Sequence, residues 1–217
     1  MAYADLDALV DLDSTALLVV DVQRAFAAPD SPLADAGLDV SDPVETVPRV
    51  ESLLDMARAA DLPVAFTRSY RRADGRDAAE VVYDVLPRVA RSGDPICCAG
   101  SDDVAFVDGV EPREDEYEVH KQRYDAFHGT SLAYYLRAED VDTLLVCGFT
   151  TNVCVEGTAR GAHERGFNVL LVEDCCASFS ADQHAAGVRN VELMLGTTAT
   201  LDEVRTELFE ETPAVTE

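Results

Sequence analysis

The chain has 217 residues, which suits one domain with a sizeable core, since length divided by about 150 residues per domain gives between one and two. Its 17 basic and 42 acidic side chains give a formal net charge of −25. This charge excludes an electrostatic nucleic-acid binder, which needs a basic surface, and disfavours attachment to anionic lipid, so we expect neither nucleic acid nor a membrane as partner.

Short apolar runs alternate with segments of helical spacing along the chain. In chain order, the pattern predicts a buried strand over residues 16–21, a helix over 43–60 and a strand over 63–67. Residues 69–115 are polar and irregular, and we expect one short helix near 78–86 within them. Further along, we predict a weaker strand over 117–121, a helix over 131–137, a strand over 143–148, a helix over 152–165 closed by Gly166, a strand over 169–174, a helix over 181–195 and a short strand over 198–201.

Several of these strands are apolar throughout, which indicates strands covered by helices on both faces. We therefore predict one α/β domain over residues 1–217, a doubly wound three-layer αβα sandwich with a mainly parallel sheet of about six strands. Ligands of such sheets bind outside the carboxyl ends of the strands, near the switch in strand order. Three reactive residues fall at this edge: Asp21 ends the first strand, Lys121 ends the third, and Cys154 begins the helix after the fourth.

The surface is expected to be acidic everywhere, because acids run along the whole chain and are densest between Asp102 and Glu118. At 47% hydrophobic residues, the chain has the core that acidic disordered proteins lack. This pattern is typical of proteins from salt-loving organisms, in which salt screens the self-repulsion, and an ordinary acidic cytosolic protein is the alternative.

Six cysteines stand at positions 97, 98, 147, 154, 175 and 176, as two adjacent pairs and two single residues without a Cys-x-x-Cys spacing. That is a poor basis for a secreted disulfide framework. The first residues are acidic and lack the basic region of a signal peptide, and no apolar stretch reaches the roughly 18 residues of a membrane span. We expect a cytoplasmic protein with reduced cysteines.

Asp21, Lys121 and Cys154 together could form a nucleophilic site. A helix N-terminus and a nearby cation both favour a thiolate, and Cys154 would have the first from its helix and the second from Lys121. Asp21 is placed to take the thiol proton as a base. Because 16 of the 17 basic residues are arginine, the single lysine indicates a need for an amine. The trio needs no metal and no cofactor, and the other five cysteines are expected to be buried apolar residues.

A Cys–His pair is the alternative arrangement. His163 lies nine residues after Cys154 on the same predicted helix, about 13–14 Å along its axis, and therefore cannot pair with it. His120 and His128 flank the lysine segment and stay open as partners. His184 begins a later predicted helix and is expected to be solvated.

Three segments resemble the isochorismatase-like cysteine hydrolase superfamily, which includes isochorismatases, nicotinamidases, N-carbamoylsarcosine amidohydrolases and ureidoacrylate amidohydrolases. They are LVVDVQRAF at 18–26, KQRYDAFHGTSL at 121–132 and CGFTTNVCVEGTAR at 147–160, within a resemblance that covers about residues 16–201. It implies a triad of Asp21, Lys121 and Cys154, and backbone N–H groups of Thr150 and Cys154 that hold an oxyanion. It also implies a cis peptide between Phe149 and Thr150, and a homo-oligomer, either a dimer or a tetramer.

Departures from the family pattern narrow the expected chemistry. Nicotinamidases carry metal-binding histidines after the second strand, where this chain reads FTRSYRR at 66–72, and no histidine precedes His120. We therefore expect no metal. The complete trio favours hydrolysis of a C–N bond in a small amide or ureido (carbamoyl) compound through a thioester. The alternatives are an isochorismatase-type vinyl-ether hydrolase and a non-catalytic small-molecule-binding relative.

A nucleotide-binding protein of the same topology is disfavoured, because no glycine fingerprint follows the first strand and the chain has no P-loop. Phe26, Tyr124 and Phe127 neighbour the trio in sequence and are candidates for the walls of a substrate pocket. Four arginines between residues 68 and 76 could bind a substrate carboxylate.

Overall fold

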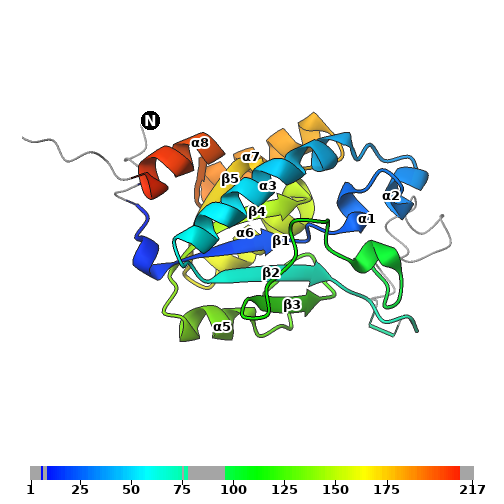
Figure 1. Ribbon diagram of the computed structural model, residues 1–217, viewed down its shortest axis with the longest axis horizontal. Helices are drawn as coiled ribbons and strands as arrows, with labels where there is room; N and C mark the ends of the chain where they lie inside the picture. The colour runs from blue at the N-terminus through cyan, green and yellow to red at the C-terminus, as the bar shows by residue number, and fades with distance from the viewer. Residues whose placement is uncertain (1–5, 7–8, 75, 78–95, 211–217) are drawn as a thin grey trace, which may run out of the picture.

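Six parallel strands form one sheet in the order β3-β2-β1-β4-β5-β6 (Figure 1). The computed structural model describes residue 6 and residues 9–74, 76–77 and 96–210. The sheet confirms the predicted α/β fold, whereas the helix expected near residues 78–86 lies outside the described residues. The strands are β1 (Thr15–Val20), β2 (Val64–Ser69), β3 (Tyr117–Lys121), β4 (Thr143–Phe149), β5 (Asn168–Ala177) and β6 (Thr197–Ala199).

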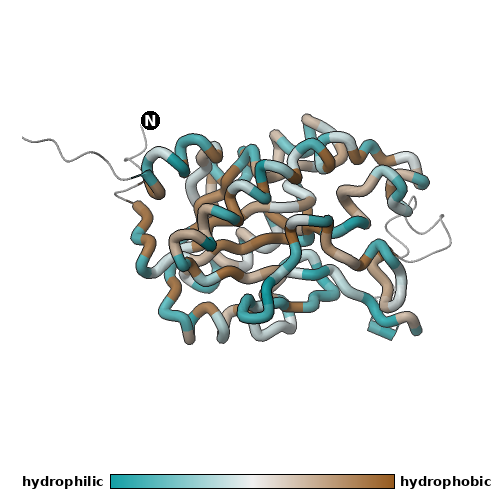
Figure 2. The backbone as a smooth tube through the Cα atoms, viewed as in Figure 1, coloured by the Kyte–Doolittle hydropathy of each residue, from teal (hydrophilic) through white to brown (hydrophobic). Residues whose placement is uncertain are grey.

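The two central strands carry the middle of the core. Every residue of β1 and of β4 is buried, and Figure 2 shows hydrophobic residues gathered along the middle of the sheet. Phe66 and Phe149 are among the largest fully buried side chains. Because these strands have helices on both faces, their uninterrupted apolar runs are the pattern that a covered parallel sheet requires.

Helices cover both faces of the sheet. The chain passes from β1 to β2 toward one edge of the sheet, and from β4 to β5 toward the other edge. Because both crossovers are right-handed, their helices lie on opposite faces. One helix, α3, connects β1 to β2 and packs on β1, β4 and β5, in front of the sheet in Figure 1. Helices α6 and α7 pack on each other and on β5. The α-helices are α1 (Arg24–Ala27), α2 (Pro32–Asp35), α3 (Ser41–Ala59), α5 (Leu132–Ala138), α6 (Glu156–His163), α7 (Ala181–Met194) and α8 (Leu201–Val204). Shorter helical turns are η2 (Leu12–Ser14), η4 (Asp102–Val104), η5 (Thr151–Val155) and η6 (Arg205–Phe209).

The switch in strand order lies between β1 and β4, whose carboxyl ends are neighbours. Val20 pairs with Gly148, and a Cβ atom on that glycine would lie 2.1 Å from the carbonyl oxygen of Val20. Gly148 also has a φ of +117°, a conformation that glycine adopts without steric cost. This close approach brings Asp21, just after β1, next to the turn that follows β4.

The structure differs from the sequence-based elements at four places. The strand predicted over 198–201 ends at Ala199, and Leu201 begins helix α8, because Thr200 and Glu203 form a capping box that starts this helix. Strand β5 continues past the acids at 173 and 174, because Cys175, Cys176 and Ala177 are again buried. The helix predicted over 152–165 is divided, with a π-helical turn η5 before α6. The helices α1 and α2 were not predicted, since four residues are too few to give a helical period.

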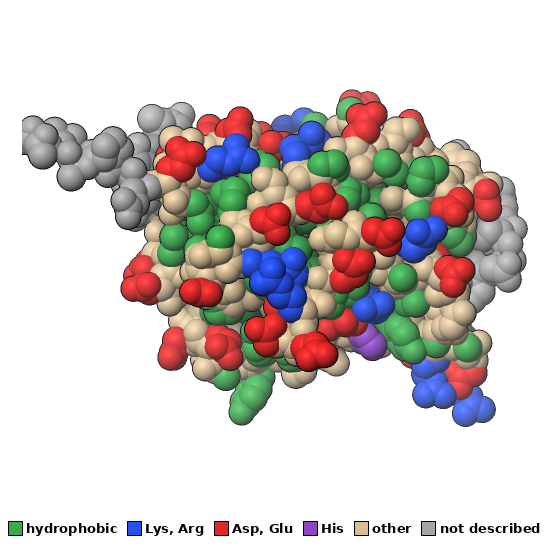
Figure 3. All heavy atoms as spheres, viewed as in Figure 1, with side chains coloured by type: hydrophobic (Ala, Val, Ile, Leu, Met, Phe, Trp, Pro, Cys, Tyr) green, Lys and Arg blue, Asp and Glu red, His purple; other side chains and the backbone are tan. Residues whose placement is uncertain are grey.

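Acidic side chains are scattered over the face seen in Figure 3, with fewer basic ones among them. Within the described ranges, no helix combines the length and the apolar character that crossing a membrane requires.

Candidate active site

The structure brings Asp21, Lys121 and Cys154 together at the carboxyl edge of the sheet. The Nζ atom of Lys121 lies 2.6 Å from Oδ2 of Asp21, and the Cys154 thiol lies close enough to both charged groups for each to shift its pKa. The exposed fractions of the three residues are 0%, 1% and 6% in chain order. Lys121 ends the edge strand β3, so its four-carbon stem has to reach past the end of β2 to meet the carboxylate.

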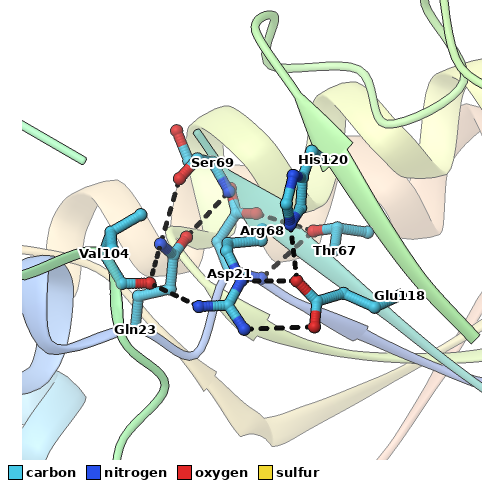
Figure 4. A network of polar contacts seen from close by, with 8 residues as sticks. All are labelled: Asp21, Gln23, Thr67, Arg68, Ser69, Val104, Glu118 and His120. Carbon is cyan, nitrogen blue, oxygen red and sulfur yellow. Dashed lines mark hydrogen bonds and ion pairs between the residues drawn. The ribbon is translucent and has the colours of Figure 1, made fainter. Parts of the chain in front are cut away.

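Asp21 is held by β2, and chiefly by Thr67. The Thr67 hydroxyl donates to Oδ1 of Asp21 at 2.6 Å, and the backbone N–H of Asp21 donates to Oγ1 of Thr67 at 3.2 Å (Figure 4). In the described part of the chain, Oδ2 accepts no well-directed hydrogen bond and has the Lys121 ammonium as its ion-pair partner. The two carboxylate oxygens therefore have different surroundings, and Oδ2 is the one left for a further proton.

Gln23 fixes the segment that follows Asp21. Its amide nitrogen donates to the carbonyls of Ser69 and Val104 at 3.0 and 2.9 Å, and its amide oxygen accepts the N–H of Ser69 at 2.8 Å (Figure 4). This buried amide ties the ends of β1 and β2 to the loop around residue 104. Neither Thr67 nor Gln23 was a sequence-based candidate, because the sequence does not show which side chains lie against Asp21 and the strand ends in the fold.

Lys121 is charged in the folded protein. Burial opposes its ammonium form, but the ion pair with Asp21 and the contact with Cys154 outweigh burial and raise the pKa of Lys121 above its usual value. The ammonium also donates to the carbonyl of Arg123 at 3.1 Å. A buried cation therefore persists beside the thiol.

Cys154 lies in the π-helical turn η5 rather than in regular α-helix. The carbonyl of Thr150 accepts the N–H groups of Val153 and Val155 at 3.0 and 3.2 Å but not that of Cys154 between them. A cis peptide bond joins Phe149 to Thr150, at the position that the family resemblance implied. The turn thus leaves the Cys154 N–H without the bond that an α-helix would give it to Thr150.

Opposing influences act on the pKa of the Cys154 thiol. Burial is the largest influence and raises the pKa, Lys121 lowers it and Asp21 raises it, and together these bring the pKa of the thiol to about 12. The cation expected to favour the thiolate is largely neutralised by its own ion pair with Asp21. The lowering by Lys121 agrees with the expectation that a nearby cation favours the thiolate, but burial outweighs it, so the pKa of the thiol stays raised and a base is needed to take the proton.

Helix α7 supports the turn that carries Cys154. Gly187 packs so closely that a Cβ atom there would lie 2.9 Å from the backbone nitrogen of Asn152. Nδ1 of His184 lies 2.9 Å from Oγ1 of Thr151, and the Ser178 hydroxyl donates to Asn152 Oδ1 at 2.6 Å. His184 is half-buried rather than solvated, which corrects the sequence-based expectation, and burial lowers its pKa.

The remaining histidines lie apart from the thiol. The His120 ring stacks on Tyr70 at 4.5 Å and its Nε2 contacts Glu118, while His128 and His163 are exposed. The other five cysteines are buried and free, as expected of apolar filler. Among the residues that the structure describes, no cluster of three or more His, Cys, Asp or Glu side chains could hold a metal ion.

A cavity of about 420 Å³ opens beside Cys154. Of the three pocket candidates, Phe26 and Tyr124 line this cavity, whereas Phe127 does not, because its ring turns into the core and stacks on Phe167 at 5.8 Å. Of the four arginines between 68 and 76, Arg71 lines the cavity. Arg68 pairs with Glu118, whereas Arg72 and Arg76 lie beside Asp74 at the surface.

Comparisons with known proteins agree with this geometry. Residues 15–203 match the family model described as the isochorismatase domain. The chain is 33% identical over 197 residues to the ureidoacrylate amidohydrolase RutB of Methylobacterium radiotolerans, a match covering 86% of this chain and 76% of the relative. An isochorismatase family protein from Desulfovibrio vulgaris superimposes with a TM-score of 0.78 at 30% identity, covering 89% of this chain and 97% of that one. A cysteine hydrolase from Pseudomonas syringae pv. phaseolicola gives 0.75 at 30% identity, with 91% and 93% covered. The chain therefore belongs to the isochorismatase-like hydrolase family.

Proposed function

We propose that this protein hydrolyses a C–N bond of a small amide or ureido compound through a thioester on Cys154. The observation that carries the proposal is the buried contact of a thiol, an ammonium and a carboxylate at the end of a cavity. A thiol supplies the nucleophile, the carboxylate supplies a base, and neither function needs a metal. The ureidoacrylate amidohydrolase among the relatives supports the same reaction type.

The first half of the reaction forms the thioester. The Cys154 sulfur attacks the carbonyl carbon while its proton moves to Oδ2 of Asp21, since the resting thiol is neutral and Oδ1 already accepts the Thr67 hydroxyl. The C–N bond then breaks, and Asp21 returns the proton to the leaving nitrogen, which departs as ammonia or an amine.

The second half regenerates the thiol. Water attacks the thioester carbon and gives a proton to Asp21, and the C–S bond breaks as the acid is released. Asp21 then returns that proton to the departing sulfur. Lys121 keeps its charge throughout and stabilises the negative charge that appears on the sulfur and on Asp21.

The developing oxyanion needs donors that are fixed before the reaction starts. The N–H groups of Thr150 and Cys154 are our candidates, because η5 leaves the second of them without an α-helical bond to Thr150. The first follows the cis peptide at the end of β4. Removing one such donor typically costs about 10²–10³ in kcat.

The test uses wild-type protein, Cys154→Ala and Cys154→Ser with a panel of primary amides, ureido compounds and isochorismate, assayed for ammonia and for pyruvate. We expect ammonia from wild type, none from Cys154→Ala, and an acyl adduct on Cys154 by mass spectrometry of the quenched reaction. Undiminished turnover in Cys154→Ala would overturn the thiol mechanism. Pyruvate from isochorismate in both proteins would assign the vinyl-ether reaction instead.

A further inference from the structure

One side of the cavity beside Cys154 is apolar. Six aliphatic or phenyl side chains of the described residues line it, and they come from α1, α2, the loop before α3, position 96, the turn η5 and the residues just after β5. Four of the six are only partly buried although they pack against the core. The six are Phe26, Leu33, Leu38, Ile96, Val153 and Phe179.

Polar groups gather at the reactive end instead. The polar lining residues come from the ends of β2 and β3, the turn after β4 and the start of α7: Ser69, Arg71, Lys121, Gln122, Arg123, Tyr124, Thr150, Asn152, Cys154 and Gln183. The cavity therefore has a polar side at the carboxyl edge of the sheet, where an amide group can react, and an apolar side formed largely by α1, α2 and the loop before α3. Pockets of this kind place a few polar groups to fix orientation and use apolar walls for binding energy.

The size of the cavity separates substrate classes. An apolar cavity of about 150 Å³ is large enough to hold benzene. The 420 Å³ beside Cys154 is nearly three times that volume. A urea or a short ureido acid has few apolar atoms, so it would leave the partly exposed side chains Leu38, Ile96 and Phe179 in contact with water.

We infer that the acyl group of the substrate is apolar and at least the size of a phenyl ring, so that the substrate class is the carboxamides of aromatic or branched aliphatic acids. This inference rests on the proposed C–N hydrolysis and deepens it. The amide would meet Cys154, and the hydrocarbon part would cover the six apolar walls. A ureido acid, the class suggested by the name of the ureidoacrylate-hydrolysing relative, could place its carboxylate near Arg71 or Arg123, but it would leave the six apolar walls uncovered, so we expect it to be the poorer substrate.

The first experiment compares acetamide, propionamide, isobutyramide, benzamide, phenylacetamide and 3-ureidopropionate by ammonia release. We expect kcat/KM to rise about fourfold with each added methylene, and by at least 100-fold from acetamide to benzamide. A flat series, or 3-ureidopropionate as the best substrate, overturns the inference while leaving C–N hydrolysis in place.

A pair of variants locates the preference. Leu38→Asn places an amide on the apolar wall, in a loop away from the reacting groups, and is expected to lower the benzamide-to-acetamide ratio of kcat/KM at least tenfold. Leu193→Asn makes the same replacement at a side chain that is 76% exposed and outside the cavity lining, and should leave the ratio unchanged. Equal ratios in both variants would mean that the wall does not select the substrate.

Binding without turnover separates this inference from the proposed function. Calorimetry with Cys154→Ala should show benzamide binding at least 30-fold more tightly than acetamide. That result together with no hydrolysis of any amide by wild type would reject the proposed reaction but keep the apolar ligand class. Equal binding of the two amides would reject the ligand class, whatever the activity of the wild type.

Discussion

The Thr67 hydroxyl and the Asp21 carboxylate are joined in both directions, because Oγ1 donates to Oδ1 at 2.6 Å and accepts the Asp21 N–H at 3.2 Å. The pair fixes the rotation of the carboxylate and occupies Oδ1. Oδ2 is then the oxygen that faces the Lys121 ammonium, 2.6 Å away. We regard Thr67 as a positioning residue, since it acts on the reaction through Asp21.

Replacing Thr67 by valine keeps the shape of the side chain and removes the hydroxyl. A hydrogen bond to a charged group contributes about 1.5–3 kcal/mol. If the bond is needed for proton transfer, kcat should fall by about 10–100-fold with little change in KM, as steady-state kinetics will show. Thr67→Ser keeps the donor and should restore kcat to within about threefold of wild type. Equal losses in the two variants would show that packing, and not the hydroxyl, matters at this position.

Gly187→Ala tests the contact between α7 and the turn of Cys154. A Cβ atom there would lie 2.9 Å from Asn152 N and 3.0 Å from Thr151 C, so either the helix or the turn must shift. Alanine gains about 1 kcal/mol of helix propensity over glycine, but overpacking typically costs about 1–3 kcal/mol. We expect a lower free energy of unfolding by urea titration, and a lower kcat because the nucleophile moves.

Gly157→Ala is the matched control for that variant. Gly157 is also helical, but its added Cβ would meet its nearest neighbour at an ordinary 3.5 Å. Helix propensity then decides, and the free energy of unfolding should rise by up to about 1 kcal/mol. The same sign of change in both variants would argue against close packing as the cause.

The sequence could predict the sheet and the three reactive residues for a physical reason. Apolar runs mark buried strands, and the topology of such sheets brings strand ends to one edge, where Asp21, Lys121 and Cys154 stand out by type. Thr67 could not be found in this way, because its role depends on pairing with a residue 46 positions away. Phe127 follows Tyr124 closely in sequence, yet the turn between them sends one ring into the core and leaves the other at the cavity.

The pKa of the Cys154 thiol could not be predicted from the sequence, for a different reason. A cation and a helix start are visible in the chain, but the cost of burying a thiolate depends on packing that only the folded structure defines. Here burial outweighs Lys121, whose charge is already paired with Asp21.

This balance predicts a loss of stability at high pH. The pKa of the Cys154 thiol is raised from 9.0 to about 12, chiefly by burial, so the thiol of the unfolded chain ionises first as the pH increases. The contribution is fully present below pH 9 and is lost between pH 9 and 12, and it amounts to about 4 kcal/mol at its limit. Lys121 acts in the same direction, since its raised pKa gives stability that is lost above 10.5.

Urea unfolding from pH 8 to pH 11 at constant salt measures this effect. Cys154→Ala removes one titrating thiol. For each protein, the loss in free energy of unfolding between pH 8 and pH 11 is measured, and we expect this loss to be about 2–3 kcal/mol smaller in Cys154→Ala than in wild type. Leu193→Ala changes an exposed residue that does not titrate and should follow the wild-type curve. If Cys154→Ala also follows that curve, the buried thiol does not control alkaline unfolding.

The net charge of −25 predicts that salt stabilises the fold. The screening length falls from about 10 Å at 0.1 M salt to about 3 Å at 1 M, so repulsion among surface acids should largely disappear over this range. We expect the thermal midpoint to rise steeply between 0.1 and 2 M KCl. Sucrose strengthens apolar burial without screening charge, and it should raise the midpoint much less at equal osmolality.

Neutralising part of the acidic surface should stabilise the fold at low salt, as added salt does. Asp108, Glu114 and Asp115 are exposed and lie in the segment where acids are densest. The triple variant Asp108→Asn, Glu114→Gln and Asp115→Asn reduces the net charge from −25 to −22, because three negative side chains become neutral. Its midpoint in 0.1 M KCl should be higher than that of wild type, and the difference should shrink toward zero in 2 M KCl. A difference that stays the same at both salt concentrations would point to a local effect of the substitutions, since only long-range repulsion is removed by screening.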